Sequence, residues 1–128
     1  MNVLLAEDDP INQKVASVLL KKAGHSVQVA QNGLEATALI AREQFDIVLM
    51  DMHMPEMDGL AATRAIRALT SQAASVPIVA LTASGSLSDI QVCLDAGMNY
   101  FLVKPFKMDR FDSILAEIAS VANKKGNS

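Results

Sequence analysis

The chain has 128 residues, of which 51% are hydrophobic, so it can form one domain with a core and has no room for a second. Its 14 acidic and 11 basic side chains are mixed along the sequence, and no basic stripe indicates direct binding to nucleic acid. The single cysteine, Cys93, excludes an internal disulfide and a thiolate metal cluster and favours a reducing compartment. Because no apolar run approaches the roughly 20 residues of a membrane span and no signal-like stretch precedes the first run, we expect a cytoplasmic chain with no membrane segment.

Apolar runs that predict buried strands alternate along the chain with helical patterns. The runs cover residues 3–6, 45–50, 76–82 and 100–103, and the alternating stretch 25–31 is typical of a more exposed edge strand. Between and after the runs, apolar residues recur at spacings of three and four within residues 11–19, 34–41, 60–69, 90–94 and 111–122. This alternation predicts an α/β fold, a doubly wound five-stranded parallel sheet with helices on both faces.

Turn and capping residues mark the same boundaries. Asp9 before Pro10 fits a helix N-cap followed by proline in the first turn, Gly24 fits the end of that helix, and Asp58 precedes the third helix. The domain is expected to cover residues 1–124, and residues 125–128 form a polar tail that we expect to fray.

Chemistry is expected just beyond the carboxyl ends of the strands, where such sheets bind ligands. The residues at these positions are Glu7, Asp8, Asp51, Thr82 and Lys104. In a sheet of order 2-1-3-4-5, neighbouring strands are about 4.8 Å apart, so Asp51 would lie between the acids of the first loop and the Thr82 hydroxyl. Lys104 would start roughly 10 Å from Asp51, a gap that a lysine side chain can cross.

The acidic cluster predicts a site for a divalent cation. Glu7, Asp8 and Asp51 offer hard oxygen ligands without histidine side chains or thiolates, which favours Mg²⁺ or Mn²⁺ over zinc or copper. Asp9 is better explained as the helix cap. Without the ion, we expect mutual repulsion to raise the pKa of one carboxyl of the cluster.

A carboxylate beside Mg²⁺, a hydroxyl and an ammonium group indicate phosphoryl transfer. Asp51 would be the nucleophile, Lys104 would neutralise phosphoryl oxygens, and Thr82 would donate a hydrogen bond to one of them. The product would be an aspartyl phosphate. Because no glycine-rich phosphate loop is present, no nucleotide site is expected.

At this point the sequence resembles the receiver domains of two-component response regulators, and most closely those of hybrid histidine kinases. The resemblance covers nearly the whole chain and is carried by "LLAEDDPINQ", "DIVLMDMHMPEMDGLAATRAIR", "VPIVALTA" and "AGMNYFLVKPF". It implies a flavodoxin-like (βα)5 fold and a signalling phosphoacceptor rather than an enzyme with an external substrate. The donor would be a phosphohistidine on a histidine kinase or histidine phosphotransfer domain, and phosphorylation would leave a monomer or a weak dimer. The chain would then be either a stand-alone receiver or a domain of a hybrid kinase, in the second case the cytoplasmic part of a membrane-anchored protein.

The resemblance also assigns roles to individual residues. Asp51 would be the phosphoacceptor, Asp8 a direct Mg²⁺ ligand, Glu7 a ligand acting through water, and the backbone carbonyl of His53 a further ligand. The remaining implied features are the switch residues Thr82 and Phe101, the phosphate-binding Lys104, a cis peptide between Lys104 and Pro105, and a change in the face formed by the fourth helix, fifth strand and fifth helix.

Three features depart from the commonest pattern of the family. Glu7 stands in place of a frequent aspartate, and Phe101 in place of a frequent tyrosine. A phenylalanine at this point is also explained by simple packing in the core. His53 and Ser84 occupy positions that influence access of water to the phosphoryl group, so the lifetime of the phosphorylated state does not follow from the sequence.

Two other classes of function remain open. The first is a Mg²⁺-dependent phosphatase with an aspartyl-phosphate intermediate, but such enzymes usually carry a second acid where this chain has His53, and they need a cap domain. The second is a phosphorylation-independent interaction module or a flavin mononucleotide carrier, and the acidic first loop would repel the phosphate of that cofactor. Turnover of a phosphomonoester would favour the phosphatase, and absence of a yellow colour would exclude bound flavin. The complete set of acids, hydroxyl and lysine argues against the interaction module.

Overall fold

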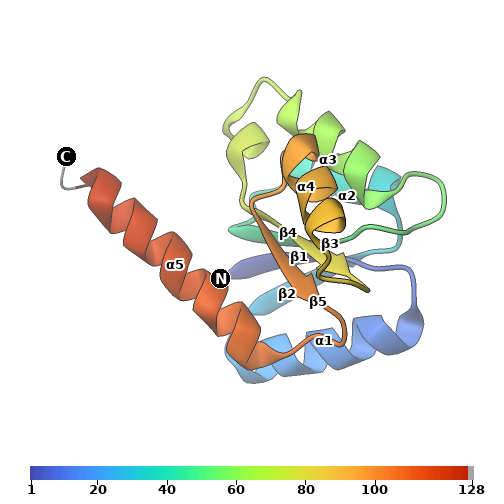
Figure 1. The fold of residues 1–128 in the computed structure, drawn as a ribbon, viewed down its shortest axis with the longest axis horizontal. Helices are drawn as coiled ribbons and strands as arrows, with labels where there is room; N and C mark the ends of the chain where they lie inside the picture. The colour runs from blue at the N-terminus through green and yellow to red at the C-terminus, as the bar shows by residue number, and fades with distance from the viewer. Residues whose placement is uncertain (127–128) are drawn as a thin grey trace.

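The computed structural model describes residues 1–126 and forms an α/β sandwich (Figure 1). In chain order, the elements are β1 (Asn2–Ala6), α1 (Pro10–Lys22), β2 (Ser26–Ala30), α2 (Gly33–Arg42), β3 (Ile47–Asp51), α3 (Gly59–Arg67), a short 3-10 helix η1 (Gln72–Ser75), β4 (Ile78–Thr82), α4 (Leu87–Ala96), β5 (Tyr100–Val103) and α5 (Met108–Gly126). The five strands are parallel and follow the order β2-β1-β3-β4-β5, which confirms the predicted sheet.

Two apolar cores lie on opposite faces of the sheet. Side chains of α2, α3 and α4 form one core with residues such as Leu4, Val48 and Ile78, whereas α1 and α5 form the other with Leu5, Leu49 and others. Every residue of β3 and β4 is buried, as the continuous apolar runs predicted. In β2 only Ala30 is fully buried, which fits its position at the edge of the sheet.

The predicted helix boundaries are also present. The Asp9 side chain accepts a hydrogen bond from the Ile11 amide, 2.9 Å away, at the start of α1, and Asp58 caps α3 in the same way through Ala61. Gly24 follows the end of α1 with a φ of 95°, a conformation that glycine adopts without a steric penalty. The fourth strand starts at Ile78 rather than residue 76, because Pro77 has no amide hydrogen to donate to a neighbouring strand.

The helix α5 extends past the edge of the sheet (Figure 1). It continues to Gly126 and so includes two residues that the sequence assigned to a polar tail. The other two tail residues, 127 and 128, lie outside the described residues, and the division at residue 124 stays a prediction. None of the helices within residues 1–126 combines the length and apolar character needed to cross a membrane.

Candidate phosphoryl-transfer site

Glu7 and Asp8 follow directly after β1 at the carboxyl edge of the sheet. The Glu7 amide donates to the Ala30 carbonyl of β2, 3.0 Å away, so the β1–β2 pairing continues through this residue. Glu7 Oε1 accepts hydrogen bonds from the Asp9 amide and from Asn12 Nδ2, both at 3.3 Å. These contacts turn the Glu7 side chain inward, where it is 1% exposed, whereas Asp8 is exposed to solvent.

Asp51 is the last residue of β3 and is 3% exposed. Its Oδ1 atom accepts a hydrogen bond from the His53 amide at 3.2 Å, and its Oδ2 atom accepts one from Lys104 Nζ at 2.9 Å. Gly59 packs directly on the Asp51 backbone, because a Cβ atom at position 59 would clash with the Asp51 carbonyl. The first turn of α3 therefore closes against the residue at the centre of the site.

Lys104 reaches Asp51 by crossing the end of β4. It follows β5, and the peptide bond between Lys104 and Pro105 is cis, as the family resemblance implied. Its Nζ atom also lies 3.5 Å from Glu7 Oε2. One ammonium group thus contacts both buried carboxylates, and the predicted crossing of two strand spacings is present.

Thr82 ends β4 but its hydroxyl is not directed to Asp51 in this structure. Thr82 Oγ1 donates to the Ser84 carbonyl at 2.8 Å and accepts from the Ser84 amide at 3.1 Å. The side chain is nevertheless only 4% exposed. The hydroxyl is therefore at the predicted place, engaged with the loop that follows its own strand.

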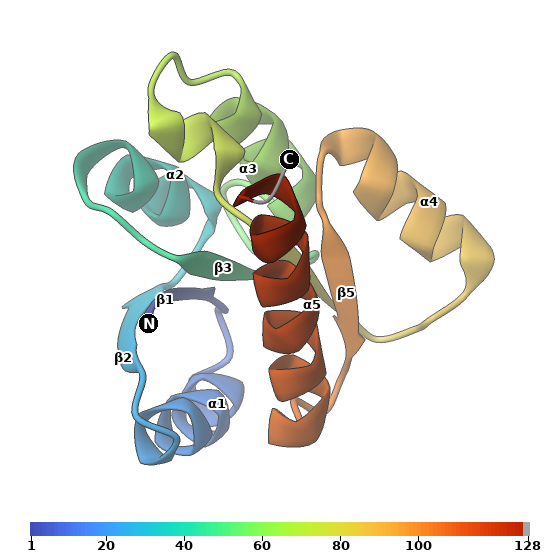
Figure 2. The same cartoon turned by 90° about the vertical axis from the view of Figure 1, so that its left-hand side faces the viewer.

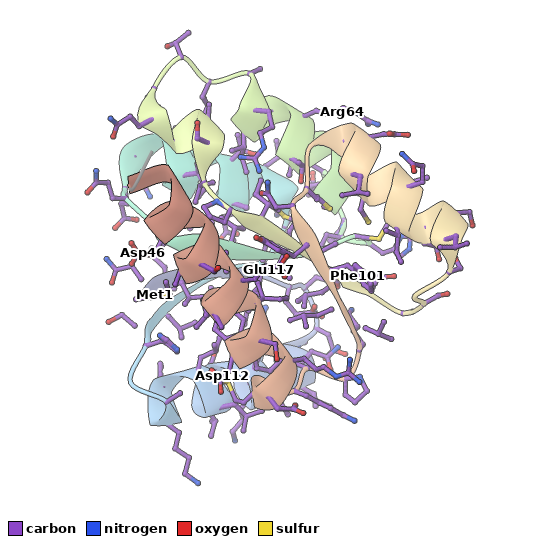
Figure 3. The ribbon with its side chains drawn as sticks, turned by 60° about the vertical axis from the view of Figure 1, so that its left-hand side comes forward. Met1, Asp46, Arg64, Phe101, Asp112 and Glu117 are labelled. Carbon is purple, nitrogen blue, oxygen red and sulfur yellow. The ribbon has the colours of Figure 1, made fainter. Side chains whose placement is uncertain are left out.

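Phe101 does not belong to the core. It is 40% exposed and lies on β5 (Figure 3). Leu102, next to it, is buried in the core that α1 and α5 form, so Phe101 points to the opposite side of the sheet. The interpretation of Phe101 as a plain core residue is wrong. Only the second half of α4 is buried against the rest of the domain, and this leaves the part of β5 that carries Phe101 uncovered.

The site carries more negative than positive charge. Glu7, Asp8 and Asp51 each offer a carboxylate oxygen, and these atoms lie within 4.8 Å of one another. Burial, and after it the neighbouring Asp51 carboxyl, raises the pKa of Glu7 to about 6. One acid of the cluster therefore has a raised pKa as expected, but burial contributes more to the shift than repulsion does. Burial of Lys104 lowers its pKa, but the hydrogen bond and charge of Asp51, with Glu7, outweigh this effect and raise it.

A divalent cation fits this donor set. Within the described residues, Glu7 Oε2 is buried and accepts no hydrogen bond, since Lys104 Nζ at 3.5 Å is poorly placed to donate. A buried oxygen without a partner costs free energy that a cation ligand would offset. The three ligands are hard oxygens, and His53, whose side chain is exposed, adds no nitrogen ligand from inside the cluster.

Two residues that the sequence analysis did not single out hold Glu7 in place. Asn12 donates to both Glu7 and Asp9, and the Gln13 side chain donates to the Glu7 carbonyl. The position of Asn12 in the sequence could have indicated this role, because a side chain three residues after an N-cap can reach back over the start of its helix. The acidic loop is therefore fixed by the first turn of α1.

Fold and site together define a signalling domain of the two-component class. The sequence matches the family model described as the response regulator receiver domain over residues 3–116, and the chain belongs to this family. It is a receiver domain of two-component signalling, a class with a phosphoacceptor role in phosphorelays. It is also similar to part of hybrid signal transduction histidine kinase B of Dictyostelium discoideum, with 45% identity over 82% of the chain.

The chain is much shorter than such relatives. It spans 6% of the length of histidine kinase B, and 15% and 10% of two other curated histidine kinases that it matches.

Solved structures show the same architecture. The receiver domain of sensor histidine kinase PA1611 from Pseudomonas aeruginosa has 41% identity and a TM-score of 0.83, and the match covers 91% of this chain and 94% of that one. That structure contains a magnesium ion in its active-site cleft. A second match, with 34% identity and a TM-score of 0.80, comes from the co-crystal structure of the phosphotransfer protein Ypd1 and the Ssk1 receiver domain of Saccharomyces cerevisiae, and covers 88% of this chain and 83% of that one.

Proposed function

We propose that Asp51 accepts a phosphoryl group from a phosphohistidine of a histidine kinase or histidine phosphotransfer domain. The observation that carries this proposal is the convergence on Asp51 of Lys104, 2.9 Å away, and of the acidic cluster. A carboxylate oxygen of Asp51 attacks phosphorus, the bond from phosphorus to the imidazole nitrogen breaks, and the imidazole leaves with the electron pair of that bond. The product is an aspartyl phosphate at position 51.

The residues around Asp51 supply what this reaction needs. Lys104 is paired with Asp51 before the transfer, and afterwards its ammonium group can pair with an oxygen of the phosphoryl group. Glu7, Asp8, Asp51 and the His53 backbone carbonyl would hold Mg²⁺ or Mn²⁺, which when bound neutralises phosphoryl oxygens. The cation also offsets the repulsion between the acids of the cluster.

Thr82 and Phe101 are proposed to transmit the phosphorylation. The Thr82 hydroxyl now donates to Ser84, so its donation to a phosphoryl oxygen requires that this contact break and that the loop after β4 move. Gly85 in this loop lies against β5, because a Cβ atom at position 85 would be 3.3 Å from Val103 and 4.0 Å from Phe101. Movement of the loop therefore changes the space available to Phe101, and with it the face formed by α4, β5 and α5.

An exposed apolar stripe on α1 is proposed to bind the phosphodonor. Ile11, Val15 and Val18 are 73%, 47% and 53% exposed and occupy one side of α1, which starts next to Asp8. Apolar side chains at this spacing are typical of a helix surface that packs on another helix. A helical partner on this stripe would bring a histidine close to the opening of the site.

The proposal is tested by the mass of the intact protein after incubation with acetyl phosphate and Mg²⁺. We expect one added phosphoryl group in the wild type and in Asp112→Asn, an exposed acid on α5 that serves as the matched control (Figure 3). We expect none in Asp51→Asn or in the presence of EDTA. Equal labelling of Asp51→Asn and the wild type would contradict the assignment, and steady release of phosphate from an added phosphomonoester would indicate the phosphatase instead.

A further inference from the structure

Arg67, at the end of α3, contacts several segments at the edge of the domain opposite the candidate site. Its guanidinium group donates four hydrogen bonds, to the carbonyls of Gly97, Ala74 and Val76 at 2.9, 2.8 and 2.7 Å and to Asn99 Oδ1 at 2.7 Å. Asn99 Oδ1 in turn accepts from the Ile78 amide at 2.9 Å. Arg67 thus joins α3 to the segment before β4 and to the turn between α4 and β5.

No acid is part of this arrangement. Within the described residues Arg67 forms no salt bridge, and all its acceptors are neutral oxygens. Burial lowers the pKa of the guanidinium group, but arginine stays charged at neutral pH. Hydrogen bonds from a charged donor are about twice as strong as neutral ones, and three of these four are partly shielded from solvent, so they hold the contacting segments together.

The carboxyl end of α4 is fixed in a second way. Gly97 has a φ of 106°, and the amides of Gly97 and Met98 donate back to Leu94 and Cys93 at 3.0 Å, which closes the last turn. A Cβ atom at Gly97 would lie 2.9 Å from Arg67 Cγ, so the arginine side chain packs directly on this turn. The buried residues of α4, Cys93 and Ala96, belong to the same half of the helix.

The amino end of α4 is held much more weakly. Leu87, its first residue, is 86% exposed, and no residue before Cys93 is buried. Its cap is a single hydrogen bond of 3.3 Å from the Asp89 amide to the Ser86 hydroxyl. In Figure 2 this helix lies beside β5, joined to it at one end and to the loop after β4 at the other.

From this contrast we infer that Arg67 anchors the carboxyl end of α4 at Gly97, so that α4 pivots at this end and swings at its amino end when the loop after β4 moves. The segments that Arg67 joins then behave as one rigid unit. A displacement that begins at Thr82 and Ser84 becomes a rotation of the helix, because a translation of α4 would pull the turn at its carboxyl end away from Arg67 and break the hydrogen bonds to the Gly97 carbonyl and to Asn99 Oδ1. The movement itself rests on the proposed function, whereas the anchor does not.

Residue-resolved amide hydrogen exchange of the unphosphorylated protein tests the anchor. We compare the wild type with Arg67→Lys, which keeps the charge but loses the fork of donors, and with Arg64→Lys, an exposed arginine on the same helix (Figure 3). The expected result is exchange about tenfold faster at Ile78 and Met98 in Arg67→Lys alone, with amides in α1 unchanged. Unchanged exchange at these two amides would overturn the inference. Should Arg67→Lys not fold, Asn99→Ala removes one acceptor of the guanidinium group and is read at Met98 alone, because Asn99 Oδ1 is also the acceptor of the Ile78 amide.

The pivot is tested by repeating the measurement after acetyl phosphate and Mg²⁺ have added the phosphoryl group. In the wild type we expect exchange to change at residues 88–91 and to stay constant at residues 97–99, whereas in Arg67→Lys the change should reach residues 97–99. If Arg67 only stabilised the fold, Arg67→Lys would lower the free energy of unfolding, but the change in exchange on phosphorylation would stay confined to residues 88–91. Equal changes at both ends of α4 in the wild type would overturn the pivot. Absence of labelling in the mass measurement would count against the proposed function and leave the anchor result intact.

Discussion

Lys104 Nζ lies 2.9 Å from Asp51 Oδ2 and 3.5 Å from Glu7 Oε2, so one cation balances two buried acids. The ammonium group therefore competes with a metal ion for the same carboxylate charge, and it also supplies positive charge for a phosphoryl group. These two effects predict opposite consequences for metal binding and for phosphorylation when the lysine is replaced.

Lys104→Met should bind Mg²⁺ several-fold more tightly and accept the phosphoryl group about 10- to 100-fold more slowly. Binding improves because the Lys104 ammonium group, which pairs with both Asp51 and Glu7, no longer competes with the metal ion for these carboxylates. Calorimetric titration with Mg²⁺ and the time course of the intact mass measure the two effects. Lys107→Met, which removes an exposed charge nearby, should change neither. Weaker Mg²⁺ binding by Lys104→Met would contradict the competition.

The pH dependence of stability should reveal Glu7. Its pKa is raised from 4.5 to about 6, so the folded state binds a proton more tightly than the unfolded state does. The resulting stabilisation is complete below pH 4.5 and is lost as the pH rises through about 6. In the metal-free wild type, the free energy of unfolding should fall by as much as about 2 kcal/mol over this window relative to Glu7→Gln.

Urea denaturation of both proteins, followed by circular dichroism in EDTA at pH values across this window, measures the difference. Addition of Mg²⁺ should remove it, because a bound cation favours the ionised carboxylate. Parallel pH curves for the two proteins in EDTA would show that Glu7 titrates normally.

Asp8 and Asp9 are adjacent acids with different expected roles. Mg²⁺ at 100 times its dissociation constant should stabilise the wild type by about 2.7 kcal/mol. Asp8→Asn should lose most of this gain, because Asp8 belongs to the cluster of three carboxylates. Asp9→Asn should keep it, since Asp9 caps α1 through the Ile11 amide and asparagine caps a helix about as well. Thermal unfolding with and without Mg²⁺ compares them, and an equal loss in both variants would refute the division of roles.

The sequence predicted those parts of the site that depend on strand order. Glu7 and Lys104 each follow a strand and Asp51 ends one, and in a parallel sheet of known order this places them at one edge with known spacing. The preference for Mg²⁺ or Mn²⁺ followed from the carboxylate oxygen ligands alone. Side-chain length then explains why Lys104 spans β4 to contact Asp51.

Features that depend on packing between helices and loops were not predictable in this way. The engagement of Thr82 with Ser84 depends on the conformation of a loop, and the exposure of Phe101 depends on how much of β5 is covered by α4. The four hydrogen bonds of Arg67 join segments up to 32 residues apart, and no local pattern indicates them. Such contacts follow from the tertiary structure and carry no periodic signal.

Glu56 has an unfavourable backbone conformation in the loop that contains His53. Its φ is 67°, a region in which side chains are disfavoured, and the next amide, that of Met57, donates back to Pro55 at 2.7 Å. Met57 is held on its other side by the Gly33 amide of α2, 2.9 Å from its carbonyl, and a Cβ atom at Gly33 would clash with this carbonyl. The close packing of α2 on the loop therefore leaves Glu56 little freedom to relax.

Glu56→Gly should raise the free energy of unfolding by about 0.5–1 kcal/mol relative to Glu56→Ala, which removes the same charge but keeps a Cβ atom. Urea denaturation of the two variants measures this difference, and an alanine variant as stable as the glycine variant would show that the backbone at residue 56 is unstrained.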